Sequence, residues 1–184
     1  MKRILIYCLL FSLVPAGCED DAPSSFDCPS APGPSAPSAS MDPPSPPEHP
    51  CDFVMAQKNG TVWKAHAATY FIEGSDTLHI TAHQNEETLG IRLLFTGTGT
   101  YRILPVPSAR YFEDNAYFYI TVGQDVIIDH YNLLEEGHLQ IVEYNETQNL
   151  IKGVFNLPLI QYPTSGTPKT LFFNEGTFSV HLPD

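Results

Sequence analysis

A single stretch decides the fold class: Thr77-Leu78-His79-Ile80-Thr81-Ala82-His83. Its apolar residues alternate with its polar residues, and successive side chains of a strand point to opposite faces of a sheet. The stretch therefore predicts a half-buried strand, with Leu78 and Ile80 on the buried face and His79 and His83 on the polar face. On either side of this strand, the apolar residues do not follow the 3.6-residue spacing of a helix over any long stretch.

β-prone runs of similar length continue in both directions. Asn59-Gly60 lies between two of them and is a strong hairpin signal, because both residues tolerate a positive φ. The expected strands are residues 53–57, 61–65, 77–83, 90–95, 100–104, 116–122, 126–131, 138–144, 150–157 and 171–182, with one helical turn at 131–136. Short strands without room for crossover helices predict an all-β, antiparallel fold, either a β-sandwich or a small meander barrel of about 8–10 strands.

Composition limits the function classes. The chain has 184 residues and a formal net charge of −12, with a sequence pI near 4.8. Nucleic-acid binding needs clustered Lys and Arg to neutralise phosphates, so this class of partner is excluded. No apolar run reaches the roughly 18 residues that a membrane-spanning helix requires. Residues 53–184 hold twice as many acidic as basic residues and are enough for a single all-β domain with one hydrophobic core.

The N-terminus has the pattern of a secretory signal. The positive start Lys2-Arg3 precedes an apolar run at residues 4–14, and small residues follow. Residues 1–17 are therefore expected to be a signal peptide. An ordinary cut after Ala16 would release a soluble protein that begins at Gly17.

The alternative is lipidation. The run Ala16-Gly17-Cys18 resembles the lipobox of bacterial lipoproteins, whose cysteine receives a diacylglycerol thioether and further acyl chains. Cysteine counting favours this alternative: Cys8 is lost with the signal, and an ordinary cut would leave three thiols. With Cys18 lipidated, Cys28 and Cys51 remain as an even pair in an oxidising compartment, which makes them a candidate disulfide.

The residues after Cys18 have the composition of a spacer. Residues 19–52 contain 10 Pro, 7 Ser and 7 acidic residues, with no Lys or Arg. Such a segment buries too little apolar surface to fold, and Pro-rich chain extends by about 3.1 Å per residue, which gives a reach of about 100 Å. We expect a signal peptide at 1–17, a lipidated Cys18 with a disordered tether at 18–52, and one all-β domain at 53–184.

Three segments of the expected domain are Asn59-Gly60-Thr61-Val62-Trp63, Asn149-Leu150-Ile151-Lys152-Gly153-Val154-Phe155 and Gly176-Thr177-Phe178-Ser179-Val180. Together with the lipobox and the tether, they resemble a family of functionally uncharacterised bacterial lipoproteins that share an all-β domain. Glu19-Asp20-Asp21 resembles the acidic signal that sends some lipoproteins to the cell surface. These resemblances imply a lipid anchor in the bacterial outer membrane, with the domain surface-exposed or facing the periplasm, and they imply no activity.

Catalytic and metal-binding motifs with a diagnostic spacing, such as Gly-x-Ser-x-Gly or His-Glu-x-x-His, do not occur. His79 and His83 lie about 13 Å apart on one strand, too far to share a metal ion. The adjacent carboxylates Glu86-Glu87, Glu113-Asp114 and Glu135-Glu136 fall between strands, and each would need a carboxylate from another segment to form a catalytic pair. We therefore expect no enzyme activity, no metal site and no cofactor.

Aromatic residues supply the candidate ligand surface. Tyr117 and Tyr119 share one face of an expected strand, and Tyr111 lies just upstream. Exposed rings on a sheet stack on sugars or contact a partner protein, whereas the alternative is cross-strand packing with only the phenol tips in water.

These observations favour a non-enzymatic, membrane-anchored lipoprotein whose β domain binds an envelope or external protein or glycan. One alternative is a carrier in which a closed barrel encloses a small apolar ligand. A further alternative is a hydrolase of envelope polymers, which would bring carboxylates or histidines from different strands into one cleft. The expected partners are the membrane, through the anchor on Cys18, and a glycan or envelope protein.

Overall fold

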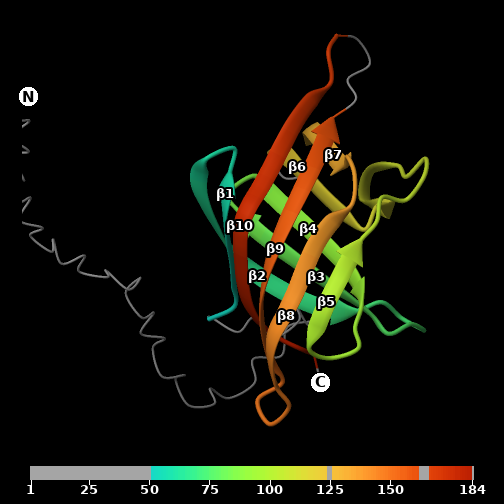
Figure 1. The fold of residues 1–184 in the computed structure, drawn as a ribbon. Coiled ribbons are helices and arrows are strands. Elements are labelled where there is room, and N and C mark those ends of the chain that lie inside the picture. Colours follow the sequence, from blue (N-terminus) through green and yellow to red (C-terminus); the bar gives the residue numbers. More distant parts are fainter. Residues whose placement is uncertain (1–50, 124–125, 162–165, 184) are drawn as a thin grey trace, which may run out of the picture. The chain divides into compact units, whose positions relative to one another are not determined.

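A computed structural model describes residues 51–123, 126–161 and 166–183, all of which lie in one compact unit. These residues form ten β-strands and one short 3-10 helix (Figure 1). The elements are β1 (Phe53–Lys58), β2 (Thr61–Phe71), β3 (Thr77–Gln84), β4 (Glu87–Leu94), β5 (Gly99–Ile103), η1 (Tyr111–Glu113), β6 (Ala116–Val122), β7 (Val126–Leu133), β8 (Gly137–Asn145), β9 (Leu150–Gln161) and β10 (Lys169–His181).

The strands form one antiparallel sheet that closes on itself. Neighbours follow the order β10-β1-β2-β3-β4-β6-β7-β9, and β9 pairs in turn with β10, so eight strands make a closed barrel. The long strands β9 and β10 run side by side in Figure 1. The all-β, antiparallel class predicted from the sequence is confirmed, and each of the ten expected strands overlaps an observed one.

Two strands extend the sheet beyond the ring. One edge of β9 is shared: Leu150 to Asn156 pair with β8, whereas Leu159 and Ile160 pair with β7. Strand β5 then pairs with the outer edge of β8. The length of β9 therefore lets it close the barrel at one end and carry the additional pair β8–β5 at the other.

Large aromatic side chains fill the interior. The ring of Trp63 lies edge-on to those of Phe118 and Phe173, with centroids 6.4 Å and 5.3 Å apart, and all three side chains are buried. Phe155 packs against Gly176, where a Cβ atom would lie 2.6 Å from ring carbons. This dense packing is typical of a protein core and leaves no room for a methyl group at Gly176.

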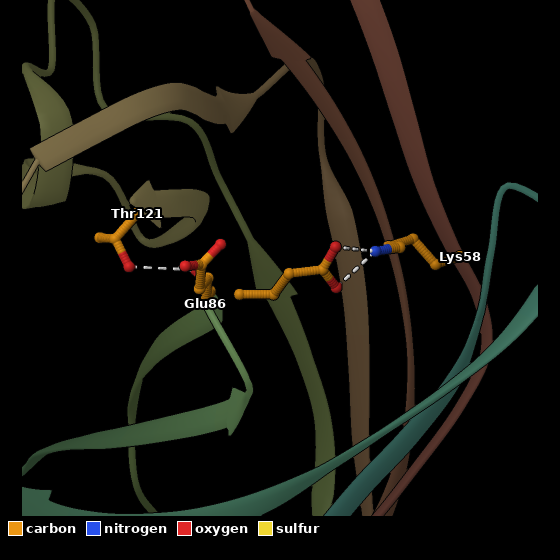
Figure 2. Close-up of polar contacts among 4 residues, drawn as sticks. Lys58, Glu86 and Thr121 are labelled. Atoms are coloured by element: carbon orange, nitrogen blue, oxygen red, sulfur yellow. Dashed lines mark hydrogen bonds and ion pairs between the residues drawn. The ribbon is translucent and has the colours of Figure 1, made fainter. Parts of the chain in front are cut away.

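An ion pair lies at the end of the interior. Lys58 ends β1 and Glu87 begins β4, and the ammonium of Lys58 contacts both carboxylate oxygens of Glu87 (Figure 2). The ammonium also lies 5.3 Å from the centroid of the Phe118 ring. Nearby, the Thr121 hydroxyl donates to the Glu86 carbonyl over 3.3 Å, which holds the β3–β4 turn against β6.

The helical turn expected at residues 131–136 is wrong. Residues Tyr131 to Leu133 continue β7, because the backbone of Leu133 pairs with Leu159 of β9 and its amide donates to the buried carboxylate of Asp114. The described helical turn is η1 instead. The predicted signal peptide and all but the last two residues of the predicted tether lie outside the described residues.

Candidate functional site

The outer face of β2, β3, β4, β6 and β7 gathers aromatic and ionisable side chains. Register places His79 of β3 between Tyr70 of β2 and Arg92 of β4. Tyr119, in the middle of β6, pairs with His130 of β7. Alternate positions on these strands supply the core, so these side chains lie on the opposite face. We name as the outer cluster the residues Tyr70, His79, Arg92, Phe112, Tyr117, Tyr119 and His130.

Tyr117 is the buried centre of the outer cluster. It pairs with Gly90 of β4, and its ring lies over the Gly90 backbone: a Cβ atom there would be 2.6 Å from Cε1. Its hydroxyl reaches Nε2 of His79 at 3.1 Å. Only 4% of Tyr117 is exposed, so its ring is not part of an open ligand surface, and the cross-strand packing considered from the sequence holds for it. The ring packs across strands because the glycine leaves space for it.

Phe112 of η1 covers this layer from outside. Its ring makes edge-on contacts with Tyr117, Tyr119 and His130, with centroid distances of 5.4, 5.0 and 5.9 Å. Phe112 itself remains 38% exposed. Of the three tyrosines expected at a ligand surface, Tyr119 is half-buried beneath Phe112, and the side chain of Tyr111 lies outside what the structure describes.

His79 is buried in the outer cluster, with 2% exposed, rather than lying on a solvated polar face. Its Nδ1 contacts the Tyr70 hydroxyl, and its Nε2 contacts the Tyr117 hydroxyl. Burial, assisted by the charge of Arg92, lowers the pKa of His79 to about 4. Burial also raises the pKa of Tyr117 to about 12, against the opposing effect of Arg92. The neutral forms of both groups are therefore favoured near neutral pH.

A buried carboxylate positions η1. Asp114 accepts hydrogen bonds from the backbone amides of Val106, Asn115 and Leu133, at 2.9, 2.8 and 2.9 Å. These bonds tie both ends of the segment between β5 and β6 to β7. Because Phe112 lies two residues before Asp114, the same bonds hold Phe112 over the outer cluster.

An open pocket of about 650 Å³ lies beside Phe112. It is lined by Arg92, Arg110, Phe112, Glu113 and Ile127, and we call it the arginine pocket. Its volume is in the range of small-molecule sites, about 300–1,000 Å³.

The two arginines of this pocket differ from three other basic residues of the domain. Lys58, Arg102 and Lys152 each form an ion pair with a glutamate. Within the described part of the chain, neither Arg92 nor Arg110 forms an ion pair, and the Nε of Arg92 is buried without a hydrogen-bond partner. The Arg92 guanidinium instead lies 5.7 Å from the Tyr117 ring centroid, a cation–π arrangement. The pocket thus brings two arginines and one glutamate together in an otherwise acidic domain.

Residues 52–181 match a family model described as a domain of unknown function, DUF6252. The chain belongs to the DUF6252 family. No curated protein and no solved structure matches it. The outer cluster and the arginine pocket lie entirely within the DUF6252 domain.

Three of the six carboxylates considered from the sequence are engaged elsewhere in the DUF6252 domain. Glu87 binds Lys58, Glu136 binds Arg102, and Asp114 accepts backbone amides. Among the described residues, no three His, Cys, Asp or Glu side chains are grouped as metal ligands. The described part of the chain also contains no helix with the length and apolarity needed to cross a membrane.

The predicted cysteine sites fall largely outside the described residues. Cys51 is disulfide-bonded. Cys28 lies outside the described part of the chain, so its pairing with Cys51 stays a prediction, as does lipidation of Cys18.

Sequence reasoning missed the two arginines as candidate site residues. The alternation of β4 places Arg92 on the outer face, and Arg110 precedes the aromatic pair Tyr111-Phe112. In an acidic domain, an arginine without a carboxylate partner would indicate a candidate binding site. Ion pairing, however, depends on contacts between distant segments, such as the bond between Arg102 and Glu136.

Proposed function

We propose that this protein is a non-enzymatic, membrane-anchored lipoprotein whose β domain binds a glycan or protein of the cell envelope or the exterior through the arginine pocket. One observation carries the proposal: Arg92 and Arg110, which have no ion-pair partner within the described residues, line the same open pocket as the exposed ring of Phe112. Binding sites typically combine an apolar wall with a few convergent polar groups.

The interior gives the carrier alternative no support. Trp63, Phe118 and Phe173 contact one another inside the barrel, and the Lys58–Glu87 pair lies over the Phe118 ring at the end of the interior. A lipid carrier needs a cavity at this position. For the hydrolase alternative, three of the candidate carboxylates, Glu87, Glu136 and Asp114, are each held by other groups of the chain.

The anchoring part of the proposal is supported by the sequence. Strand β1 begins at Phe53, directly after the Pro-rich segment 18–52 and the candidate lipidation site Cys18. Multiple acyl chains on one cysteine anchor a protein stably, whereas a single chain binds reversibly. A long spacer would let the arginine pocket reach polymers or proteins away from the membrane surface.

Anchoring is tested by intact mass of the protein from its native host, combined with protease treatment of whole cells. We expect an acylated chain that begins at Cys18, and removal of the domain from intact cells would favour the cell surface over the periplasm. An unacylated, soluble chain that begins at Gly17 would contradict the anchor.

Binding is tested on an array of neutral and acidic oligosaccharides and acidic peptides. We compare the full-length protein with the double variant Arg92→Gln/Arg110→Gln and with Arg102→Gln as a matched control, because Arg102 is 68% exposed and ion-paired outside the pocket. The proposal predicts at least one ligand that the wild type and the control retain and the double variant loses. Equal binding by all three proteins, or no binding at all, would count against it.

A further inference from the structure

The charge of the arginine pocket points to an anionic ligand. Both Arg92 and Arg110 line it, and among the described residues neither forms an ion pair, while the Nε of Arg92 is buried without a hydrogen-bond partner. The rest of the domain is acidic and repels anions, so the two arginines of this pocket are the local charges that would attract one. Guanidinium groups bind carboxylates through two parallel N–H donors, which fixes orientation as well as charge.

The same pocket contains a carboxylate, and this restricts the anion. Glu113 lines the pocket, and one of its oxygens accepts the backbone amide of Arg110 at 3.0 Å. A dianionic phosphate would be repelled by Glu113 more strongly than a singly charged carboxylate. Glu113 can instead accept hydrogen bonds from hydroxyl groups, so the lining fits a ligand that carries both a carboxylate and hydroxyls.

The aromatic wall favours a sugar ring. Phe112 is 38% exposed, and its position is fixed by edge-on contacts with Tyr117, Tyr119 and His130. A rigid ring held in this way offers an apolar contact surface at little entropic cost. Sugar rings present an apolar C–H face beside their hydroxyl groups. An acidic peptide would use the arginines, but it has no comparable use for the combination of Phe112 and Glu113.

We infer that the arginine pocket binds a carboxylate-bearing sugar residue, with its carboxylate on Arg92 and Arg110, its ring against Phe112 and a hydroxyl on Glu113. The inference rests on the proposed binding function and names the ligand class for the same pocket. Oligosaccharides of hexuronic acids have this chemistry.

The test is calorimetric titration of the full-length protein with oligosaccharides of galacturonic, glucuronic, mannuronic and guluronic acid. Each is compared with the same oligosaccharide after its carboxyl groups are reduced to alcohols. We expect at least one acidic oligosaccharide to bind tenfold or more tightly than its reduced form. Affinity should fall at least tenfold in Arg92→Gln and in Arg110→Gln, stay unchanged in Arg102→Gln, and be partly retained in Arg92→Lys.

Folding is checked separately, because Arg92 stacks on a buried tyrosine. Arg110 is exposed, so Arg110→Gln keeps the test valid if Arg92→Gln proves unstable. Equal binding of acidic and reduced oligosaccharides would overturn the carboxylate inference and leave glycan binding intact. Binding of acidic peptides alone would overturn the sugar inference and leave the pocket as a protein-binding site. No binding of any hexuronate would also overturn it, while the array decides the proposed function independently.

Discussion

Protonation of His79 is expected to destabilise the domain in mild acid. Its ring is buried between Tyr70 of β2 and Tyr117 of β6, and the charged group that faces it is Arg92 of β4. The pKa of His79 is about 4 in the folded chain, against an ordinary value of 6.5 for histidine. The unfolded chain therefore binds a proton at His79 at a pH where the folded chain does not.

The sign and size of the effect follow from this difference. The stabilisation is present above the unfolded pKa and is lost as the pH falls from about 6.5 through about 4. A shift of this size corresponds to about 3 kcal/mol of unfolding free energy in total. By the same linkage, roughly 2 kcal/mol is lost between about pH 7 and about pH 5.

Urea unfolding followed by tryptophan fluorescence measures this loss. Trp63 is the single tryptophan and is buried, so its emission reports on the folded core. We compare the wild type with His79→Gln, which removes the titrating group and keeps polar atoms near both tyrosines. Carboxylates also titrate in this pH range. Their contribution to the change of unfolding free energy with pH is the same in both proteins, so it cancels when the two changes are subtracted.

The expected result is a loss between pH 7 and pH 5 that is about 2 kcal/mol smaller in His79→Gln than in the wild type. His66→Gln serves as the control, because it removes a histidine from an exposed position of β2, and its effect should be smaller than that of His79→Gln. Identical pH dependence of the wild type and His79→Gln would refute the assignment of acid sensitivity to His79.

Three further predictions concern packing and polar contacts. Gly90→Ala should cost about 1–3 kcal/mol of unfolding free energy, because its Cβ atom overlaps the Tyr117 ring. In a chain that already carries Tyr117→Ala, the same Gly90→Ala change should cost less, and chemical denaturation of the single and double variants measures both costs. Asp114→Asn should cost about 2–3 kcal/mol, since an amide nitrogen replaces one of the two oxygens that accept backbone amides; an unchanged melting temperature would contradict this. Lys58→Met should cost about 1–2 kcal/mol by leaving Glu87 unpaired at a partly exposed site, and adding Glu87→Gln should restore most of it, which a double-mutant cycle measures.

Local patterns were sufficient to predict the strands. The alternation in Thr77–Gln84 and the Asn59-Gly60 hairpin each depend on neighbouring residues, and both were confirmed. Closure of the ring depends on the pairing of β9 with both β10 and β7, which no local pattern encodes. The helical turn expected after Tyr131 failed for the same reason, because Leu159 and Asp114 extend β7 from distant parts of the chain.

The candidate site was less predictable than the strands. Alternation correctly placed His79 opposite the core face, but its burial depends on Tyr70 and Tyr117 from other strands. The ring of Tyr117 reaches His79 because Gly90 has no side chain, and this relation requires the cross-strand register. Tyr119 was a candidate for a ligand surface, and the contact with Phe112 of η1 depends on a segment outside its own strand.

The most direct test of ligand binding at the arginine pocket is an NMR titration of the arginine Nε–H signals. The full-length protein, labelled with nitrogen-15, is titrated with the hexuronate oligosaccharide that binds best by calorimetry. If the pocket holds the ligand, the Nε–H signals of Arg92 and Arg110 shift and saturate together, while that of Arg102 stays in place. Unchanged signals from Arg92 and Arg110 at saturating ligand would contradict binding at this pocket.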